Sequence, residues 1–196
     1  EQLAEVLQRV EAGATVRLSL TRGDESVTTV DVQTAAAAEQ VEGSAVTYGS
    51  VRVPDGYRLR TIVTEPEVSR LAKAPALLYV SGIICDTIDR PTRPDAVDTR
   101  IVHAMANAGF VTMRVDKPGL GDSEGPPCSE IDLQTELAGY SAALAQLAAM
   151  PGVDPSRVYV FGHSMGGVLA PYLSTVVPVR GSIVYGTLVR TWFEYQ

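Results

Sequence analysis

The stretch that decides the fold is Val158-Tyr159-Val160-Phe161-Gly162-His163-Ser164-Met165-Gly166-Gly167. Its four leading apolar residues predict a strand buried on both faces, and this strand runs directly into a Gly-x-Ser-x-Gly sequence. The small residues that follow allow a helix to begin at once. This order predicts a sharp, strained turn that holds the Ser164 hydroxyl above the edge of a sheet.

Segments on both sides of this turn alternate between strands and helices. Apolar runs predict strands, which cover residues 46–53, 58–64, 76–80, 110–115, 158–161 and 182–185. Apolar residues at helical spacing predict helices, which cover residues 95–108, 129–150 (with Ser129 as its N-cap) and 165–174. Strands separated by helices predict an α/β fold, in which a mostly parallel sheet carries helices on both faces.

The charge balance and the motif content narrow the range of partners. The 196 residues include 16 Lys and Arg against 23 Asp and Glu, a formal net charge of -7, so we expect no nucleic-acid partner. No apolar run approaches the roughly 20 residues that a bilayer requires, so we expect no membrane span. The sequence has no His or Cys cluster at ligand spacing and no phosphate-binding or dinucleotide motif. We therefore expect neither a metal nor a cofactor.

Two cysteines, Cys85 and Cys128, each lie a few residues past the end of a predicted core strand. Loops that leave adjacent parallel strands lie side by side at one edge of a sheet, so a disulfide between them is geometrically reasonable. Two free thiols are the alternative. A disulfide would favour a periplasmic or secreted location.

The first 33 residues predict a helix followed by a hairpin. Apolar residues recur at helical spacing over residues 3–10, and strands at 15–20 and 27–32 flank the turn Arg22-Gly23-Asp24. This order resembles the C-terminal half of a bacterial PDZ domain, which is a peptide-binding fold. The resemblance implies a peptide partner for the complete PDZ-like domain.

Small residues of low complexity follow at 34–45, and we interpret them as a linker. The turn Pro54-Asp55-Gly56 then joins the first two strands of the longer alternating region. We therefore divide the chain into a PDZ-like segment at 1–33, the linker and a second domain over 46–196.

Residues 46–196 resemble the first two-thirds of an α/β-hydrolase fold. Four landmarks occur in the family's order: an opening antiparallel hairpin, a strand ending in Ser81-Gly82, a strand ending in Asp116-x-x-Gly119-x-Gly121-x-Ser123, and the turn at Ser164. Among the family's branches, the chain is most similar to serine aminopeptidase-like hydrolases and bacterial esterases that carry Gly-His-Ser-x-Gly-Gly. Four ordered landmarks are more specific than one motif.

The resemblance implies roles for three residues. Ser164 is the nucleophile, and the backbone N–H of Met165 is one donor of the oxyanion hole. The residue after Gly82 supplies the second donor, which assigns Ile83. Ile84 is the alternative, because Ser81 stands where the family usually has histidine.

Charged residues near these positions are expected to have other roles. The resemblance implies that Asp116 orders its glycine-rich loop and takes no part in a catalytic triad, with a substrate-shaping role for the motif from Asp116 to Ser123 as the alternative. The charged residues that follow the oxyanion loop are expected to be solvated, with a position at the rim of the pocket as the alternative, and these are Asp86, Asp89, Arg90 and Arg93.

A serine nucleophile needs a general base, and the sequence contains two histidines, His103 and His163. His163 adjoins Ser164, so the two side chains diverge, and His103 is expected to pack on the outside of the sheet. The family order is Ser, then Asp or Glu, then His, and the only acid after Ser164 is Glu194. We therefore expect the triad acid and histidine beyond Gln196, and we expect this chain alone to be inactive.

Two hypotheses of function result. The first is a serine hydrolase that acts on a small-molecule ester, or on an amide or peptide-like substrate, with Ser164 as nucleophile. The alternative is a non-catalytic protein in which the PDZ-like module and a silent hydrolase fold serve binding or scaffolding. The missing base favours the alternative, whereas the intact strained turn favours the enzyme.

Overall fold

The computed structural model describes residues 10, 13–35, 37–67, 73–190 and 194. The chain forms two compact units, Glu1–Ala38 and Glu39–Gln196, and the boundary between them falls within the expected linker. A helix is expected over residues 3–10, but residues 3–9 lie outside the described part of the chain.

The first unit contains an antiparallel pair of strands. β1 (Thr15–Thr21) pairs with β2 (Val27–Gln33) along the whole of both strands. The connecting turn closes with a 3.0 Å hydrogen bond from the Arg22 N–H to the Ser26 carbonyl. Val16 and Leu18 of β1 are half-buried between exposed neighbours, whereas Leu20 on the same face is exposed.

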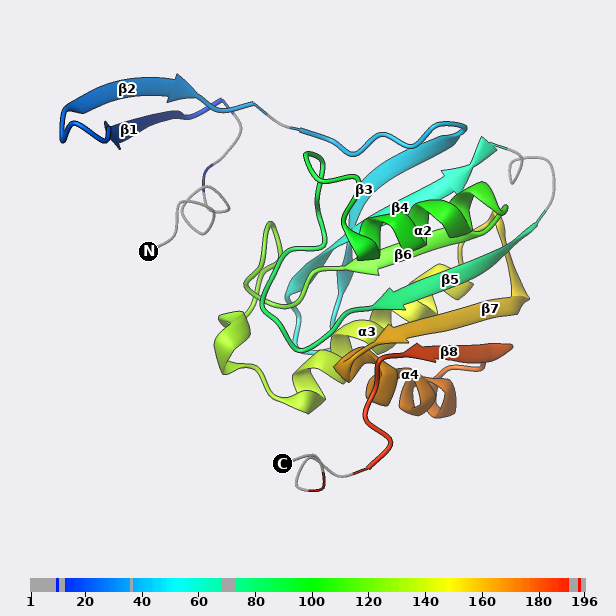
Figure 1. Cartoon of the computed structure of the whole chain (residues 1–196). Coiled ribbons are helices and arrows are strands. Elements are labelled where there is room, and N and C mark those ends of the chain that lie inside the picture. The colour runs from blue at the N-terminus through cyan, green and yellow to red at the C-terminus, as the bar shows by residue number, and fades with distance from the viewer. Residues whose placement is uncertain (1–9, 11–12, 36, 68–72, 191–193, 195–196) are drawn as a thin grey trace. The chain divides into compact units, whose positions relative to one another are not determined.

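The second unit is built on a six-stranded sheet with the order β3-β4-β6-β5-β7-β8 (Figure 1). Its strands are β3 (Ser44–Arg52), β4 (Arg58–Pro66), β5 (Ala74–Val80), β6 (Val111–Val115), β7 (Val153–His163) and β8 (Gly181–Tyr185). β3 and β4 are antiparallel to their neighbours, whereas β6, β5, β7 and β8 run parallel to one another. The predicted mostly parallel sheet is therefore confirmed.

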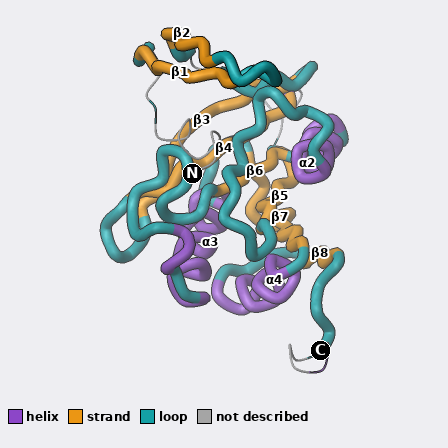
Figure 2. The backbone as a smooth tube through the Cα atoms, turned by 60° about the vertical axis from the view of Figure 1, so that its left-hand side comes forward, coloured by secondary structure: helices purple, strands orange, loops and turns teal. Residues whose placement is uncertain are grey.

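Helices cover both faces of this sheet. α2 (Val97–Asn107) lies on one face, and α3 (Leu133–Ala148) and α4 (Met165–Val176) lie on the other (Figure 2). Leu144 of α3 and Val160 of β7 belong to one fully buried apolar cluster. Burial on both faces explains why the central strands are apolar at successive positions.

One helix begins later than the sequence predicted. α3 starts at Leu133, because the Asp132 side chain caps it by accepting a 2.8 Å hydrogen bond from the Thr135 N–H. Ser129, the predicted cap, lies instead in a short 3₁₀ helix, Cys128–Glu130. An aspartate three residues downstream therefore outcompetes the serine.

A buried ion pair joins the start of the second unit to its sheet. Glu39 accepts hydrogen bonds of 2.6 and 2.9 Å from Arg114 of β6, and these side chains are only 2% and 1% exposed. The Arg90 N–H and His103 Nε2 also contact the Glu39 carboxylate, at 2.9 and 3.3 Å. Burial alone would raise the pKa of Glu39, but the bonds and charge of Arg114 outweigh it and lower that pKa.

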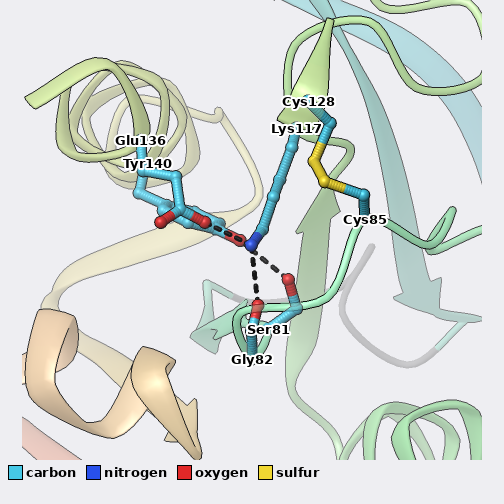
Figure 3. Close-up of a disulfide and its surroundings, with 7 residues drawn as sticks. All are labelled: Ser81, Gly82, Cys85, Lys117, Cys128, Glu136 and Tyr140. Carbon is cyan, nitrogen blue, oxygen red and sulfur yellow. Dashed lines mark hydrogen bonds and ion pairs between the residues drawn. A yellow bond between two sulfur atoms is a disulfide. The ribbon is translucent and has the colours of Figure 1, made fainter. Parts of the chain in front are cut away.

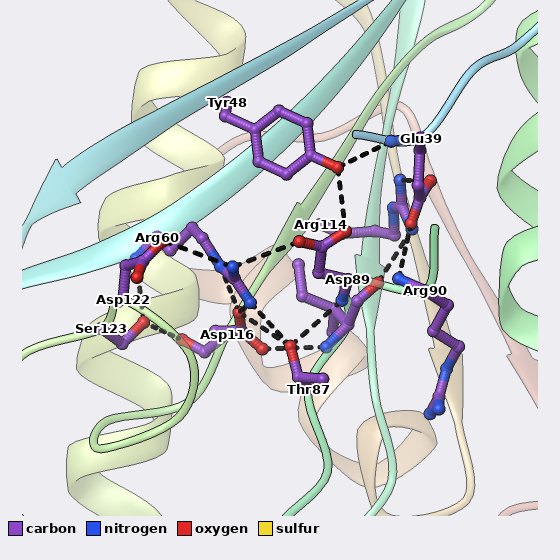
Figure 4. A network of polar contacts seen from close by, with 11 residues as sticks. Glu39, Tyr48, Arg60, Thr87, Asp89, Arg90, Arg114, Asp116, Asp122 and Ser123 are labelled. Carbon is purple, nitrogen blue, oxygen red and sulfur yellow. Dashed lines mark hydrogen bonds and ion pairs between the residues drawn. The ribbon is translucent and has the colours of Figure 1, made fainter. Parts of the chain in front are cut away.

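A second ionic cluster is centred on Asp116 at the end of β6 (Figure 4). Asp116 accepts a 2.7 Å hydrogen bond from Arg60 Nε, and Arg60 also contacts Asp89 at 3.2 Å. The Tyr48 hydroxyl donates a 2.8 Å bond to Asp89 and accepts a 2.9 Å bond from the Glu39 N–H. The two clusters are therefore continuous. Burial raises the pKa of Asp116, with Arg60 opposing the rise.

These clusters hold the segment that follows β5. The Ile88 N–H donates a 2.8 Å bond to Asp116, and the Ile88 carbonyl accepts a 2.9 Å bond from Arg114. The side chains of Asp89 and Arg90 are only 13% and 11% exposed. The expectation that this segment is solvated is therefore wrong for both. Asp89 is bound by Tyr48 and Arg60 from distant strands. Arg90 is paired with its neighbours Asp86 and Asp98.

A disulfide joins Cys85 to Cys128, and so links the segment after β5 to the loop after β6 (Figure 3). Of the two alternatives that the sequence left open, the structure has the bridge. The two cysteines are 43 residues apart. In the chain-entropy account, closing a loop of this length stabilises the fold by about 4 kcal/mol.

Glu39→Gln leaves the buried Arg114 guanidinium without its anionic partner. We expect the free energy of unfolding of the second unit, measured by urea titration at neutral pH, to fall by about 3 kcal/mol. Because the pKa of Glu39 is lowered in the folded protein, its contribution is complete above the ordinary value of about 4.3 and is lost as the pH falls further. The gap between variant and wild type should therefore narrow in acid.

The matched control is Glu124→Gln, which alters the exposed ion pair with Arg58 in the same unit. We expect this change to alter the free energy of unfolding by less than about 1 kcal/mol. If both substitutions lowered the free energy of unfolding equally, the buried pair would not stabilise the second unit more than the exposed pair does.

Replacing both cysteines, as in Cys85→Ser with Cys128→Ser, should lower the free energy of unfolding by about 4 kcal/mol, because the unfolded chain loses its cross-link. Dithiothreitol should shift the urea midpoint of the wild type and leave that of the double variant unchanged. A wild-type midpoint that is insensitive to complete reduction, verified by a thiol count, would contradict this account.

Candidate active site

Ser164 lies at the junction of β7 and α4. Its backbone has φ 55° and ψ -120°, and residues other than glycine rarely adopt a positive φ. Glu25 in the β1–β2 turn is the only other non-glycine residue with a positive φ in the described ranges. The strand-to-helix turn is thus strained, as the Gly-x-Ser-x-Gly sequence predicted.

Two glycines permit this turn, because the backbone around it is crowded. A Cβ at Gly162 would collide with the Gly166 carbonyl, and a Cβ at Gly166 would collide with the Val80 carbonyl at the end of β5. The first turn of α4 therefore packs directly on the end of β5. This contact brings Gly82, just beyond β5, so near that an added Cβ would lie 3.3 Å from Ser164 Cβ.

Backbone hydrogen bonds fix Ser164 on both sides. Its N–H donates a 2.9 Å bond to the carbonyl of Tyr185 at the end of β8, and its carbonyl accepts a 2.9 Å bond from the Gly167 N–H. Among the described residues the Ser164 hydroxyl has no hydrogen-bond partner. The turn therefore holds the backbone and leaves the hydroxyl available.

A cavity of about 240 Å³ opens beside Ser164. Apolar side chains form part of its wall, and these are Tyr79, Ile83, Ile84, Ile88 and Val97. Val97 belongs to the apolar spacing that predicted the helix over residues 95–108, but its side chain is exposed and lines this cavity. Periodicity alone cannot distinguish a helix face that packs on the sheet from one that borders a cavity.

The start of α4 and the loop after β5 lie beside Ser164. Met165 is the first residue of α4, so its N–H has no acceptor within the helix, and the positive end of the helix lies at the same place. Ile83 and Ile84 follow Gly82, and both line the cavity together with Ser164. The structure therefore brings the sequence-predicted residues Ser164, Met165 and Ile83 to one edge of the sheet.

The loop that carries Ile83 is held from its buried side (Figure 3). Lys117 Nζ donates a 2.7 Å hydrogen bond to the Gly82 carbonyl and forms a 2.5 Å ion pair with Glu136 of α3. The hydroxyls of Tyr140 and Ser81 lie 2.9 Å apart, and burial raises the pKa of Tyr140, so this hydroxyl stays protonated. Sequence reasoning gave Lys117 no role of its own.

Neither histidine contacts the Ser164 hydroxyl in the described part of the chain. His103 Nε2 lies 3.3 Å from the buried Glu39 carboxylate. His163 lines the cavity, but its ring stacks on Tyr185 with the ring centroids 5.7 Å apart. Among the described residues, the cavity is thus bordered by a serine hydroxyl, and no imidazole is positioned there as a base.

The acidic side chains near the cavity are bound to an arginine. Asp86 and Asp98 both contact Arg90, at 2.8 and 2.9 Å. Within the described ranges, no three His, Cys, Asp or Glu side chains are placed to hold a metal ion. In the same ranges, no helix is both long enough and apolar enough to cross a membrane.

Sequence comparison identifies relatives for the second unit. The family model for serine aminopeptidase, S33, matches residues 96–194, just over half of the chain. Quorum-quenching protein AidA of Acinetobacter baumannii is 36% identical over 69 residues, which are 35% of this chain and 23% of that protein. Polyketide transferase claH of Penicillium crustosum is 32% identical over 76 residues, which are 39% of this chain and 25% of that protein.

Solved structures share the fold. Hypothetical protein PA2218 from Pseudomonas aeruginosa is similar with a TM-score of 0.65 and 20% identity, over 75% of this chain and 44% of that one. The thermostable carboxylesterase EstE1, cloned from a metagenomic library, has a TM-score of 0.60 and 24% identity, over 78% and 49%. The matches thus span about a quarter of these curated relatives and less than half of these solved chains. The chain belongs to the serine aminopeptidase S33 family and has an α/β-hydrolase fold.

Proposed function

We propose that the protein is a serine hydrolase that cleaves carboxylic esters and uses Ser164 as its nucleophile. The observation that carries this proposal is the positive φ of Ser164 beside a cavity. A strained backbone of this kind costs roughly 1–3 kcal/mol and persists where function requires it. A protein that served only as a scaffold would gain stability from a glycine at this position.

In the proposed reaction, Ser164 Oγ attacks the acyl carbon while a base takes its proton. The carbonyl oxygen becomes an oxyanion, which the N–H groups of Met165 and Ile83 stabilise. Collapse of this intermediate expels the alcohol, which takes the proton from the base, and leaves an acyl group on Ser164. Water then attacks the acyl group by the same route and regenerates the enzyme.

The proposal assigns the base to a histidine outside these 196 residues. Of the two histidines in the sequence, His103 contacts Glu39 and His163 stacks on Tyr185. The matched regions of the solved relatives make up less than half of their chains, which is consistent with further catalytic residues elsewhere in the full-length protein.

The apolar side chains in the cavity wall favour a small apolar acyl group over an acyl group that carries a charge. A carboxylesterase among the structural relatives supports an ester as the substrate. The family description, serine aminopeptidase, favours an amide or peptide-like bond as the second candidate. Parallel assays of p-nitrophenyl butyrate and an aminoacyl p-nitroanilide with the full-length protein separate the two.

Fluorophosphonate labelling of the full-length protein tests Ser164 directly, because the probe forms a covalent bond with an activated serine. We expect one label per chain in the wild type and none in Ser164→Ala. Ser156→Ala, at an exposed position of β7, is the control and should label like the wild type. A wild type that takes no label, or a labelled Ser164→Ala, would rule out the proposed nucleophile.

Backbone strain at Ser164 predicts a difference between two small substitutions. Glycine accepts a positive φ without cost, whereas alanine retains the strain. We expect the free energy of unfolding of Ser164→Gly to exceed that of Ser164→Ala by about 1 kcal/mol in urea titrations. An equal or lower stability of the glycine variant would show that the turn stores no strain.

A further inference from the structure

We propose that Lys117 is a positioning residue for the oxyanion hole. It holds the Gly82–Ile83 peptide with its carbonyl toward α3, and thereby turns the Ile83 N–H toward the cavity beside Ser164. The inference rests on the function proposed above, because an oxyanion hole belongs to that reaction. Lys117 would thus act on the reaction although its side chain does not line the cavity beside Ser164.

The orientation follows from one contact. Lys117 Nζ lies 2.7 Å from the Gly82 carbonyl oxygen. A trans peptide directs its N–H opposite to its C=O, and the described residues contain no cis peptide bond. The Ile83 N–H therefore points away from Lys117.

The cavity lies on that opposite side. Lys117 is absent from its lining, whereas Gly82 and Ile83 belong to it. Lys117 packs instead with Glu136 and Tyr140 of α3 (Figure 3). The N–H that points away from Lys117 is thus directed toward the space in which an acyl oxygen would lie beside Ser164.

The cost of burying this lysine indicates that its role is more than packing. The Lys117 and Glu136 side chains are only 4% and 10% exposed. Desolvation of two such charges often cancels their attraction, and apolar residues of similar volume frequently give equal or greater stability. The carbonyl that Lys117 binds is the one that shares a peptide unit with the proposed donor.

Without the ammonium group, this peptide can rotate. Gly82 has no Cβ and can adopt backbone conformations that other residues cannot, so the rotated orientation is open to it. In that orientation the Gly82 carbonyl faces the developing oxyanion and opposes it. The disulfide at Cys85 restrains the position of the loop but does not set the direction of this peptide.

The test measures p-nitrophenyl butyrate hydrolysis by the full-length protein. Lys117→Met combined with Glu136→Leu removes both buried charges, so no unpaired charge remains and the variant should fold. We expect kcat to fall roughly 100-fold while KM changes by less than about threefold, because the lost interaction is made only in the transition state. Affinity for a boronic acid, which forms a tetrahedral adduct on the serine, should fall in parallel with kcat/KM.

Two further variants control for loss of structure. Tyr140→Phe removes a buried contact to the same loop at Ser81 and leaves the Gly82 bond intact, so kcat should stay within about threefold of the wild type. Lys117→Gln is the second variant if the double variant does not fold. Its side chain stays polar beside Glu136 but is one bond shorter than lysine, so the same fall in kcat is expected.

Crystal structures of the wild type and a Lys117 variant determine the peptide orientation independently of activity. We expect the Gly82 carbonyl to face α3 in the wild type and to be rotated, or present in two orientations, in the variant. A wild-type kcat in the variant, or an unchanged single orientation of the peptide, would overturn the proposal. A wild type that neither hydrolyses esters nor takes a fluorophosphonate label refutes the proposed function, and the crystallographic comparison still decides the role of Lys117.

Discussion

The close approach of three backbone segments at Gly162, Gly166 and Val80 is the constraint on which the rest of the structure depends. No side chain fits between them, so the first turn of α4 packs directly on the end of β5. The positive φ of Ser164, the position of the helix N-terminus and the nearness of Gly82 all follow from this contact. A sheet with the same strand order but a looser turn would separate the serine from the loop after β5.

Around this contact the protein uses one arrangement twice. A buried cation, Arg114 or Lys117, is paired with a buried carboxylate and donates a hydrogen bond to a backbone carbonyl in the segment after β5. Relative to apolar residues of similar volume, a buried ion pair often adds little net stability. Its hydrogen bonds do fix the direction of the carbonyl that the cation binds. The wall of the cavity is therefore shaped by charges that do not reach the cavity themselves.

The strands, the strained turn and the parallel sheet could be predicted because each has a local pattern in the sequence. The buried pairs could not. Glu39 lies in a stretch of small residues that indicated a linker, and its partner Arg114 is 75 residues away. Asp89 looks like a solvated loop residue for the same reason, because its ion pair with Arg60 joins distant segments and leaves no periodic signal. The disulfide remained one of two alternatives, since the sequence does not show whether two cysteines are close enough to be bridged or stay free.

Those separations also affect how the molecule folds. Arg60 and Asp116 are 56 residues apart, and contacts between such distant positions form more slowly than helices and tight turns. The turn between β7 and α4 is short, but its packing on β5 also requires strands that are distant in the sequence to come together. A chain whose buried ion pairs have not yet formed would thus lack the finished wall of the cavity, and the cavity would be completed late in folding.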